Sequence, residues 1–203
     1  SKKLIENFNL KKHHLTIEIG NNDGGMVRYL KDQGFNHLGV DPSKNVSDAA
    51  VSKGVNMLNS FFSFELSENI KNLYGKAKVF LSANTLAHIP NLNSVFEGIE
   101  NLLDDEGIYI TEDPYQVDLF KKISYDQIYD EHVFIFSLHS MKNICNKYNF
   151  EIFDVEHLGT AGGSMRYYIC KKGKRKISSN VYKYFSLEKK IDFFNNSTYI
   201  DFK

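Results

Sequence analysis

Short apolar runs alternate along this chain with segments in which apolar residues recur at the helical period. The runs that predict strands lie at residues 15–19, 37–41, 55–58, 77–83 and 107–112. The segments that predict helices lie at 24–33, 44–53, about 63–73 and 90–103. This alternation is typical of βαβ units and predicts an α/β fold with a doubly wound, mostly parallel sheet and helices on both faces. A helix over 137–148 and a hairpin over 150–157 and 164–172 would complete seven strands with one antiparallel member.

The 203 residues, of which 42% are hydrophobic, are enough for one such domain with a full core. We place that domain at residues 1–175. Residues 176–203 are mostly polar and predict helix, but they are too few for a second core. They are interpreted as a helical extension, or as the start of a truncated further domain.

Composition excludes several classes of partner. The chain has 25 basic and 25 acidic residues, so no positive surplus points to nucleic acid or to an anionic membrane. Neither an 18-residue apolar run nor the apolar core of a signal peptide is present. The two cysteines lie on apolar faces, as buried thiols do in a reducing compartment. We therefore expect a cytoplasmic protein, and the spacing of its seven histidines predicts no metal site.

A glycine-rich loop follows the first predicted strand. Its residues are Gly20, Asn21, Asn22, Asp23 and Gly24. The second predicted strand ends in Asp41, whose carboxylate can accept two hydrogen bonds from a ribose diol. Because adjacent parallel strands end at one edge of a sheet, the loop and the acid predict a site for a nucleoside-type ligand.

The loop does not carry the dinucleotide fingerprint G-x-G-x-x-G. Position 22 is asparagine, and the pattern that begins at Glu18 is E-x-G-x-x-x-G. A loop of amides and an acid suits a ligand with an amino group and a positive centre better than one with two phosphates. S-adenosylmethionine (SAM) is such a ligand. The alternative is a glycine turn in another doubly wound fold.

At these positions the sequence resembles the class I SAM-dependent methyltransferases, which have a Rossmann-like seven-stranded sheet. The resemblance implies that residues 18–24 form the first cofactor motif and that Asp41, followed by Pro42, binds the ribose. Phe61, after the third strand, lies where an adenine ring is often sandwiched; core packing of Phe61 and Phe62 is the alternative.

The loop after the fourth strand is expected to face the same crevice. Its predicted cofactor-binding residues are Asn84, Thr85 and Leu86. His88 would point into the cleft where the methyl group is transferred, with helix capping or a place at the edge of the core as the alternative.

A second polar segment follows the fifth strand and contains Tyr129, Glu131 and His132. A base beside a carboxylate is the arrangement that general-base catalysis needs, because the carboxylate fixes the imidazole tautomer. A nearby phenol can hydrogen-bond a developing oxyanion. A polar loop with a local ion pair explains the spacing equally well.

Three motifs together, at residues 84–90, 129–132 and 162–166, resemble the sugar C-methyltransferases, which act on nucleotide-linked 4-keto-deoxysugars. The resemblance implies that His132 is the general base and that Tyr129 and Glu131 position the sugar and stabilise the enolate. His88 would be a second polar contact at the reacting centre. Family members also carry an N-terminal zinc module and a further C-terminal domain, which are not present here.

Three other functions remain open at this point. The same base can deprotonate a hydroxyl or amine, which would make the chain an O- or N-methyltransferase. A domain that binds the cofactor without chemistry, and an NAD-dependent oxidoreductase, are further alternatives. The sequence does not indicate the sugar, the nucleotide, the methylated atom or the oligomeric state.

Overall fold

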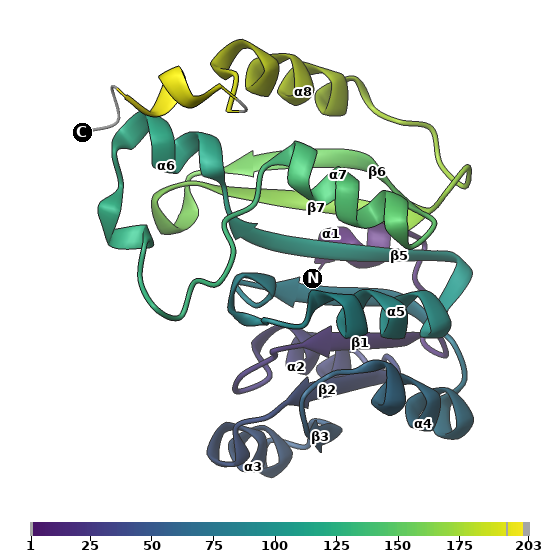
Figure 1. Ribbon diagram of the computed structural model, residues 1–203. Helices are drawn as coiled ribbons and strands as arrows, with labels where there is room; N and C mark the ends of the chain where they lie inside the picture. The colour runs from purple at the N-terminus through teal and green to yellow at the C-terminus, as the bar shows by residue number, and fades with distance from the viewer. Residues whose placement is uncertain (1, 194, 201–203) are drawn as a thin grey trace. The chain divides into compact units, whose positions relative to one another are not determined.

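The computed structural model describes residues 2–193 and 195–200 (Figure 1). The α-helices are α1 (Lys2–Asn7), α2 (Gly25–Asp32), α3 (Lys44–Ser52), α4 (Phe64–Tyr74), α5 (Leu92–Leu102), α6 (Gln116–Lys122), α7 (Leu138–Lys147) and α8 (Ser179–Ile191). The strands are β1 (Leu15–Ile19), β2 (His37–Asp41), β3 (Met57–Asn59), β4 (Ala77–Ala83), β5 (Leu103–Pro114), β6 (Phe150–Leu158) and β7 (Ser164–Lys171). Short 3₁₀ helices are η1 (Leu86–His88), η2 (Tyr125–Gln127), η3 (Thr160–Gly162) and η4 (Asn196–Tyr199).

The strands form one seven-stranded sheet in the order β3-β2-β1-β4-β5-β7-β6. The pairs β1–β2, β1–β4 and β2–β3 are parallel, and β6 and β7 form an antiparallel hairpin. Every residue of β1 and β2 is buried, as expected for central parallel strands covered on both faces. The predicted Rossmann-like sheet is therefore confirmed.

The chain divides into two compact units. The first contains residues 1–83 and 91–110, and the second contains residues 84–90 and 111–203. In the first unit α2 packs on β1 and β2, α3 packs on β2 and β3, and α4 packs against α5. In the second unit α7 and α8 both pack against β6. The predicted boundary between residues 175 and 176 falls inside the second unit and does not coincide with this division. Within the predicted extension at residues 176–203, residues 194 and 201–203 lie outside the described residues.

Two helices were not predicted from the sequence. The first is α1, before the glycine loop, and the second is α6, where the amphipathic pattern is only seven residues long. Strand β5 is also longer than expected, with twelve residues. None of the helices within residues 2–193 and 195–200 is both long and apolar enough to cross a membrane.

Candidate active site

The glycine loop of the first unit is a tight turn with left-handed backbone. Gly20 and Gly24 have φ of 66° and 82°, and Asn22 between them has φ of 51°. The Gly24 N–H donates to the Asn21 carbonyl at 2.8 Å, which closes the turn just before α2 begins. Glycine adopts these angles without steric cost, so the two outer glycines of the motif have a direct backbone role.

Asp41 joins this loop to the end of β2. Its side chain is buried, and its Oδ2 accepts a hydrogen bond from the Asn22 N–H at 2.9 Å. Its Oδ1 accepts one from the Ser43 N–H at 2.8 Å. The acid and the loop predicted to share a ligand therefore touch each other. Each carboxylate oxygen has a second lone pair, so Asp41 can accept from two hydroxyls while it holds the loop.

Glu18 ties β1 to α2 from inside the first unit. It is 4% exposed, and its Oε2 accepts a hydrogen bond from the Val27 N–H at 3.1 Å, in the first turn of α2. Burial raises the pKa of Glu18 to about 7, because a charge loses its hydration there. The side chain of this predicted cofactor-binding residue thus bonds the backbone of α2, which follows the loop.

Asn21 carries a polar atom without a partner. Its side chain is buried; Nδ2 donates to the Met57 sulfur at 3.1 Å, while Oδ1 accepts from none of the described residues. A Cβ on Gly39 would lie 2.4 Å from that Nδ2, so only glycine at position 39 leaves room for Asn21. A buried carbonyl oxygen without a donor is costly, and an amino group of a ligand would satisfy it. The role of Gly39 was not predicted, since a glycine inside a buried strand can have many structural reasons.

The remaining loop positions divide between solvent and core. Asp23 is exposed and pairs with Lys53 at 2.9 Å, and this partner lowers the pKa of the Asp23 carboxyl. Pro42 is exposed beside Asp41. Phe62 is buried edge-to-face against Phe80, with ring centroids 5.7 Å apart, whereas Phe61 is 76% exposed. One ring of the pair is therefore buried and the other exposed, and Phe61 is the ring available to a ligand.

The second unit contains the loop at residues 84–90, which bends back on the end of β5. Asn84 has φ of 49°, and its N–H donates to the Glu112 carbonyl at 2.7 Å. Thr85 and Leu86 follow, and the Leu86 side chain is fully buried. Leu86 is thus a core residue of its unit, and its carbonyl accepts a hydrogen bond from the Ile89 N–H at 3.2 Å.

His132 is held through both ring nitrogens. Its Nδ1 lies 2.8 Å from the Gln127 carbonyl oxygen, and its Nε2 lies 3.0 Å from the Tyr129 hydroxyl. Because a carbonyl can only accept, Nδ1 carries a proton, and in the neutral ring Nε2 then presents its lone pair to the phenol. The ring therefore has the tautomer of a neutral base with Nε2 as the basic atom.

The expectation that a carboxylate orients His132 is corrected by this geometry. The Gln127 backbone carbonyl takes that role, because the 3₁₀ turn at residues 125–127 brings it to Nδ1. Glu131 contributes its own carbonyl, which lies 2.9 Å from His88 Nδ1. The rings of His88 and His132 lie 4.9 Å apart between centroids. Four residues predicted from two distant segments are thus brought together: His88, Tyr129, Glu131 and His132.

The glycines of the motif at residues 162–166 have a structural reason. Gly163 has φ of 132°, and a Cβ there would lie 2.4 Å from the Asp118 side chain. Arg166 is engaged by two acids, with Nη2 at 2.7 Å from Glu112 and Nη1 at 3.0 Å from Glu156. These contacts fix the turn between β6 and β7 to the end of β5.

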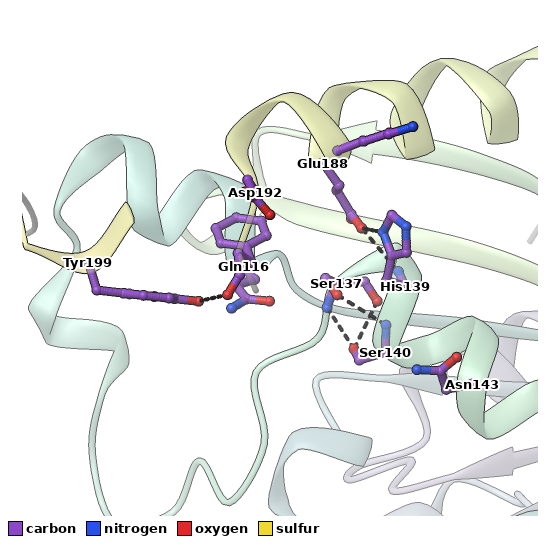
Figure 2. Close-up of a pocket in the computed structure, with 10 residues that line it drawn as sticks. Gln116, Ser137, His139, Ser140, Asn143, Glu188, Asp192 and Tyr199 are labelled. Carbon is purple, nitrogen blue, oxygen red and sulfur yellow. Dashed lines mark hydrogen bonds and ion pairs between the residues drawn. The ribbon is translucent and has the colours of Figure 1, made fainter. Parts of the chain in front are cut away.

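A separate cavity of about 480 Å³ lies in the second unit (Figure 2). Its lining residues are Gln116, Ser137, His139, Ser140, Asn143, Glu188, Lys189, Asp192, Phe193 and Tyr199. Figure 2 shows Glu188 reaching from α8 to His139 at the start of α7. None of these lining residues was predicted as a site residue.

The sheet order and the loop after β1 define a Rossmann-like methyltransferase fold. Residues 2–155 match the family model described as "Methyltransferase domain". The chain therefore belongs to the methyltransferase-domain family, and SAM is the cofactor of this class of enzyme.

Of two curated relatives, the first is a methyltransferase and the second carries the name of a different class of protein. The C-methyltransferase NovU of Streptomyces niveus is 31% identical over 161 residues, which are 79% of this chain and 38% of that protein. NAD(P)H-quinone oxidoreductase subunit J of Prochlorococcus marinus (strain NATL1A) is 36% identical over 108 residues, 49% of this chain and 59% of that protein. The chain thus spans less than two thirds of the length of either relative. The crystal structure of magnesium protoporphyrin IX methyltransferase (ChlM) from Synechocystis PCC 6803 with bound SAH shares the fold, with a TM-score of 0.64 and 17% identity over 84% of this chain and 80% of that one.

Proposed function

We propose that this chain is a SAM-dependent C-methyltransferase that methylates the carbon beside the keto group of a nucleotide-linked keto-deoxysugar. The observation that carries the proposal is the orientation of His132. Its Nδ1 is bonded to the Gln127 carbonyl, which leaves Nε2 as the basic nitrogen. The similarity to a C-methyltransferase over 79% of the chain supports carbon as the methylated atom. Carbon methylation needs a carbanion equivalent, and a proton beside a ketone is acidic enough for a histidine base once the enolate is stabilised.

The first unit supplies groups that fit the cofactor. SAM, when bound, supplies an electrophilic methyl group on a sulfonium. Asp41 would accept from the ribose hydroxyls and Asn21 Oδ1 from the amino group, while Phe61 would contact the adenine. In the second unit, Asn84 stays a predicted contact of the amino-acid end, and Thr85 stays a predicted cofactor-binding residue.

In the second unit, His132 Nε2 would take the proton from the substrate carbon. The Tyr129 hydroxyl now donates to that nitrogen, so it must turn away before Nε2 can act. Once turned, the same O–H can donate to the developing enolate oxygen. Its 45% exposure leaves the phenol room for this rotation. His88 and Glu131 would complete the polar contacts to the sugar.

The proposal is tested with SAM and a nucleoside diphosphate 4-keto-6-deoxysugar deuterated beside the ketone. We expect a product in which a methyl group has replaced one deuteron, with the new methyl group on carbon by NMR. We also expect deuterium to be washed out into water without SAM, since enolate formation precedes transfer. A methyl group on oxygen or nitrogen would show the O- or N-methyltransferase instead. Cofactor binding with neither washout nor transfer would indicate a non-catalytic domain.

Asp41→Ala should weaken binding of S-adenosylhomocysteine by roughly 1–3 kcal/mol. The variant removes the charged acceptor for the ribose and also releases the Asn22 N–H that Asp41 holds. Calorimetric titration measures the change. Asp48→Ala, which removes an exposed acid paired with Lys44 on α3 of the same unit, is the matched control and should bind nearly as well as the wild type. Equal affinity of the wild type and Asp41→Ala would remove Asp41 from the cofactor site.

A further inference from the structure

Asp113 is a fully buried carboxylate at the end of β5, in the second unit. Its Oδ1 accepts a hydrogen bond from the Ala87 N–H at 3.2 Å, and its Oδ2 accepts one from the Thr111 hydroxyl at 2.8 Å. The backbone N–H groups of Thr85 and Leu86 also donate to it. Three consecutive amides of the loop at residues 84–90 thus converge on one side chain.

The same loop is bonded on its other side to the segment that carries His132. The Ala87 carbonyl accepts a hydrogen bond from the Phe134 N–H at 3.2 Å. The His88 ring is bonded through Nδ1 to the Glu131 carbonyl at 2.9 Å. The Ala87 residue therefore contacts Asp113 through its N–H and the catalytic segment through its carbonyl. Through the loop, Asp113 is therefore connected to Glu131 and to Phe134, which lie before and after His132 in the sequence.

A carboxylate at this depth is expensive in free energy. Burial raises the pKa of Asp113 to about 7, even though every hydrogen bond to it opposes that rise. An apolar residue of similar volume would avoid the cost of desolvation but could not accept from three amides. The carboxylate is therefore explained by the conformation of residues 85–87, whose amides it accepts.

We propose that Asp113 is a positioning residue: its carboxylate sets the loop at residues 84–90 and, through that loop, the orientation of His88 and of the segment carrying His132. The inference rests on the proposed function for the role of His132. It adds a buried residue that does not touch the substrate and that neither the family match nor the motifs identified.

The test compares imidazole NMR spectra of the full chain and its Asp113→Asn variant above pH 7, where the carboxylate is ionised. Asparagine has nearly the same size but one acceptor oxygen in place of two, so the three amides and the Thr111 hydroxyl can no longer all donate as they do now, and the loop has to move. We expect the His88 and His132 ring resonances to shift, while those of His139 and His157 stay in place. Unchanged His88 and His132 resonances in the variant would overturn the proposal.

Asp118→Asn is the matched control, because Asp118 is the other buried aspartate of this unit and bonds His157 at 2.6 Å. It should shift His157 and leave His88 and His132 in place. If Asp113→Asn does not fold, Thr111→Val removes one donor from the same carboxylate and should shift the same two rings by less. No shift there would also overturn the proposal.

An activity measurement separates this inference from the proposed function. Turnover of the keto-sugar should fall by up to roughly a hundredfold in Asp113→Asn, since small misplacements of a catalytic group cost that much. Affinity for S-adenosylhomocysteine is expected to fall as well, because the loop that moves carries the predicted cofactor contacts Asn84 and Thr85. Ring shifts in a protein whose wild type does not methylate the sugar would uphold the positioning role and reject the proposed substrate. Ring shifts with undiminished turnover would reject positioning for catalysis.

Discussion

His132→Asn is expected to lower the rate of methyl transfer by about 10²–10⁴-fold, the range over which a general base contributes. The asparagine NH₂ can still donate to the Gln127 carbonyl, so the segment keeps its anchor. The variant has no basic nitrogen where Nε2 stood. The loss should therefore appear in turnover and in deuterium washout from the substrate carbon.

Binding of S-adenosylhomocysteine by His132→Asn should match the wild type. The ring is bonded to Gln127 and Tyr129, and neither is expected to bind the cofactor. Calorimetry checks the affinity, and a radiolabelled methyl assay checks the rate. Full turnover by the variant would remove His132 from the mechanism.

Tyr129→Phe is the matched control for this experiment. It keeps the aromatic ring that lies 4.2 Å from the His132 ring, and it removes only the hydroxyl bonded to Nε2. Washout should persist at a reduced rate, because the base remains while one donor to the enolate oxygen is lost. Washout abolished in Tyr129→Phe but retained in His132→Asn would make the phenol, rather than the imidazole, the base.

The sheet could be predicted from sequence because its central strands are short, largely apolar runs that end at turn residues. The ranges predicted for β1, β2 and β4 agree with the structure to the residue, since Gly20, Pro42 and Asn84 mark where these runs end. Asp41 was predictable for a related reason. An acid at the end of a buried strand is unusual, and the parallel order of β1 and β2 places Asp41 beside the glycine loop.

The contacts that hold the candidate site were not predictable in the same way. The proton of His132 is assigned by a backbone carbonyl, and no side-chain pattern marks which carbonyl a ring will meet. Asp113, followed by proline, has the sequence signature of a surface turn, yet it is fully buried. Glu188 follows Leu187 and precedes two exposed lysines on α8, so its burial depends on what α8 packs against.

Glu188→Ala should lower the free energy of unfolding by about 3 kcal/mol, because a buried acceptor is removed from several donors at once. Glu188 is 2% exposed and accepts from the Tyr115 hydroxyl at 2.8 Å. It also accepts from the N–H groups of Leu138 and His139, at 2.6 and 3.0 Å, and it lies 2.6 Å from His139 Nδ1 (Figure 2). In the variant, each of these donors would lack a protein acceptor unless a water molecule enters to replace the carboxylate.

Urea unfolding followed by circular dichroism measures this loss. Glu188→Gln keeps the volume and one carbonyl oxygen, so roughly half of the loss is expected. Lys189→Ala, at the exposed neighbouring position, should stay within about 0.5 kcal/mol of the wild type.

The result also bears on the interpretation of residues 176–203 as an extension. The Glu188 carboxylate on α8 accepts from the first amides of α7, so α8 is part of the second unit. Deleting α8 should therefore lower the free energy of unfolding, as Glu188→Ala does. A Glu188→Ala protein as stable as the wild type would instead mean that α8 is dispensable. The methyltransferase domain could then end at residue 175, as the sequence pattern indicates.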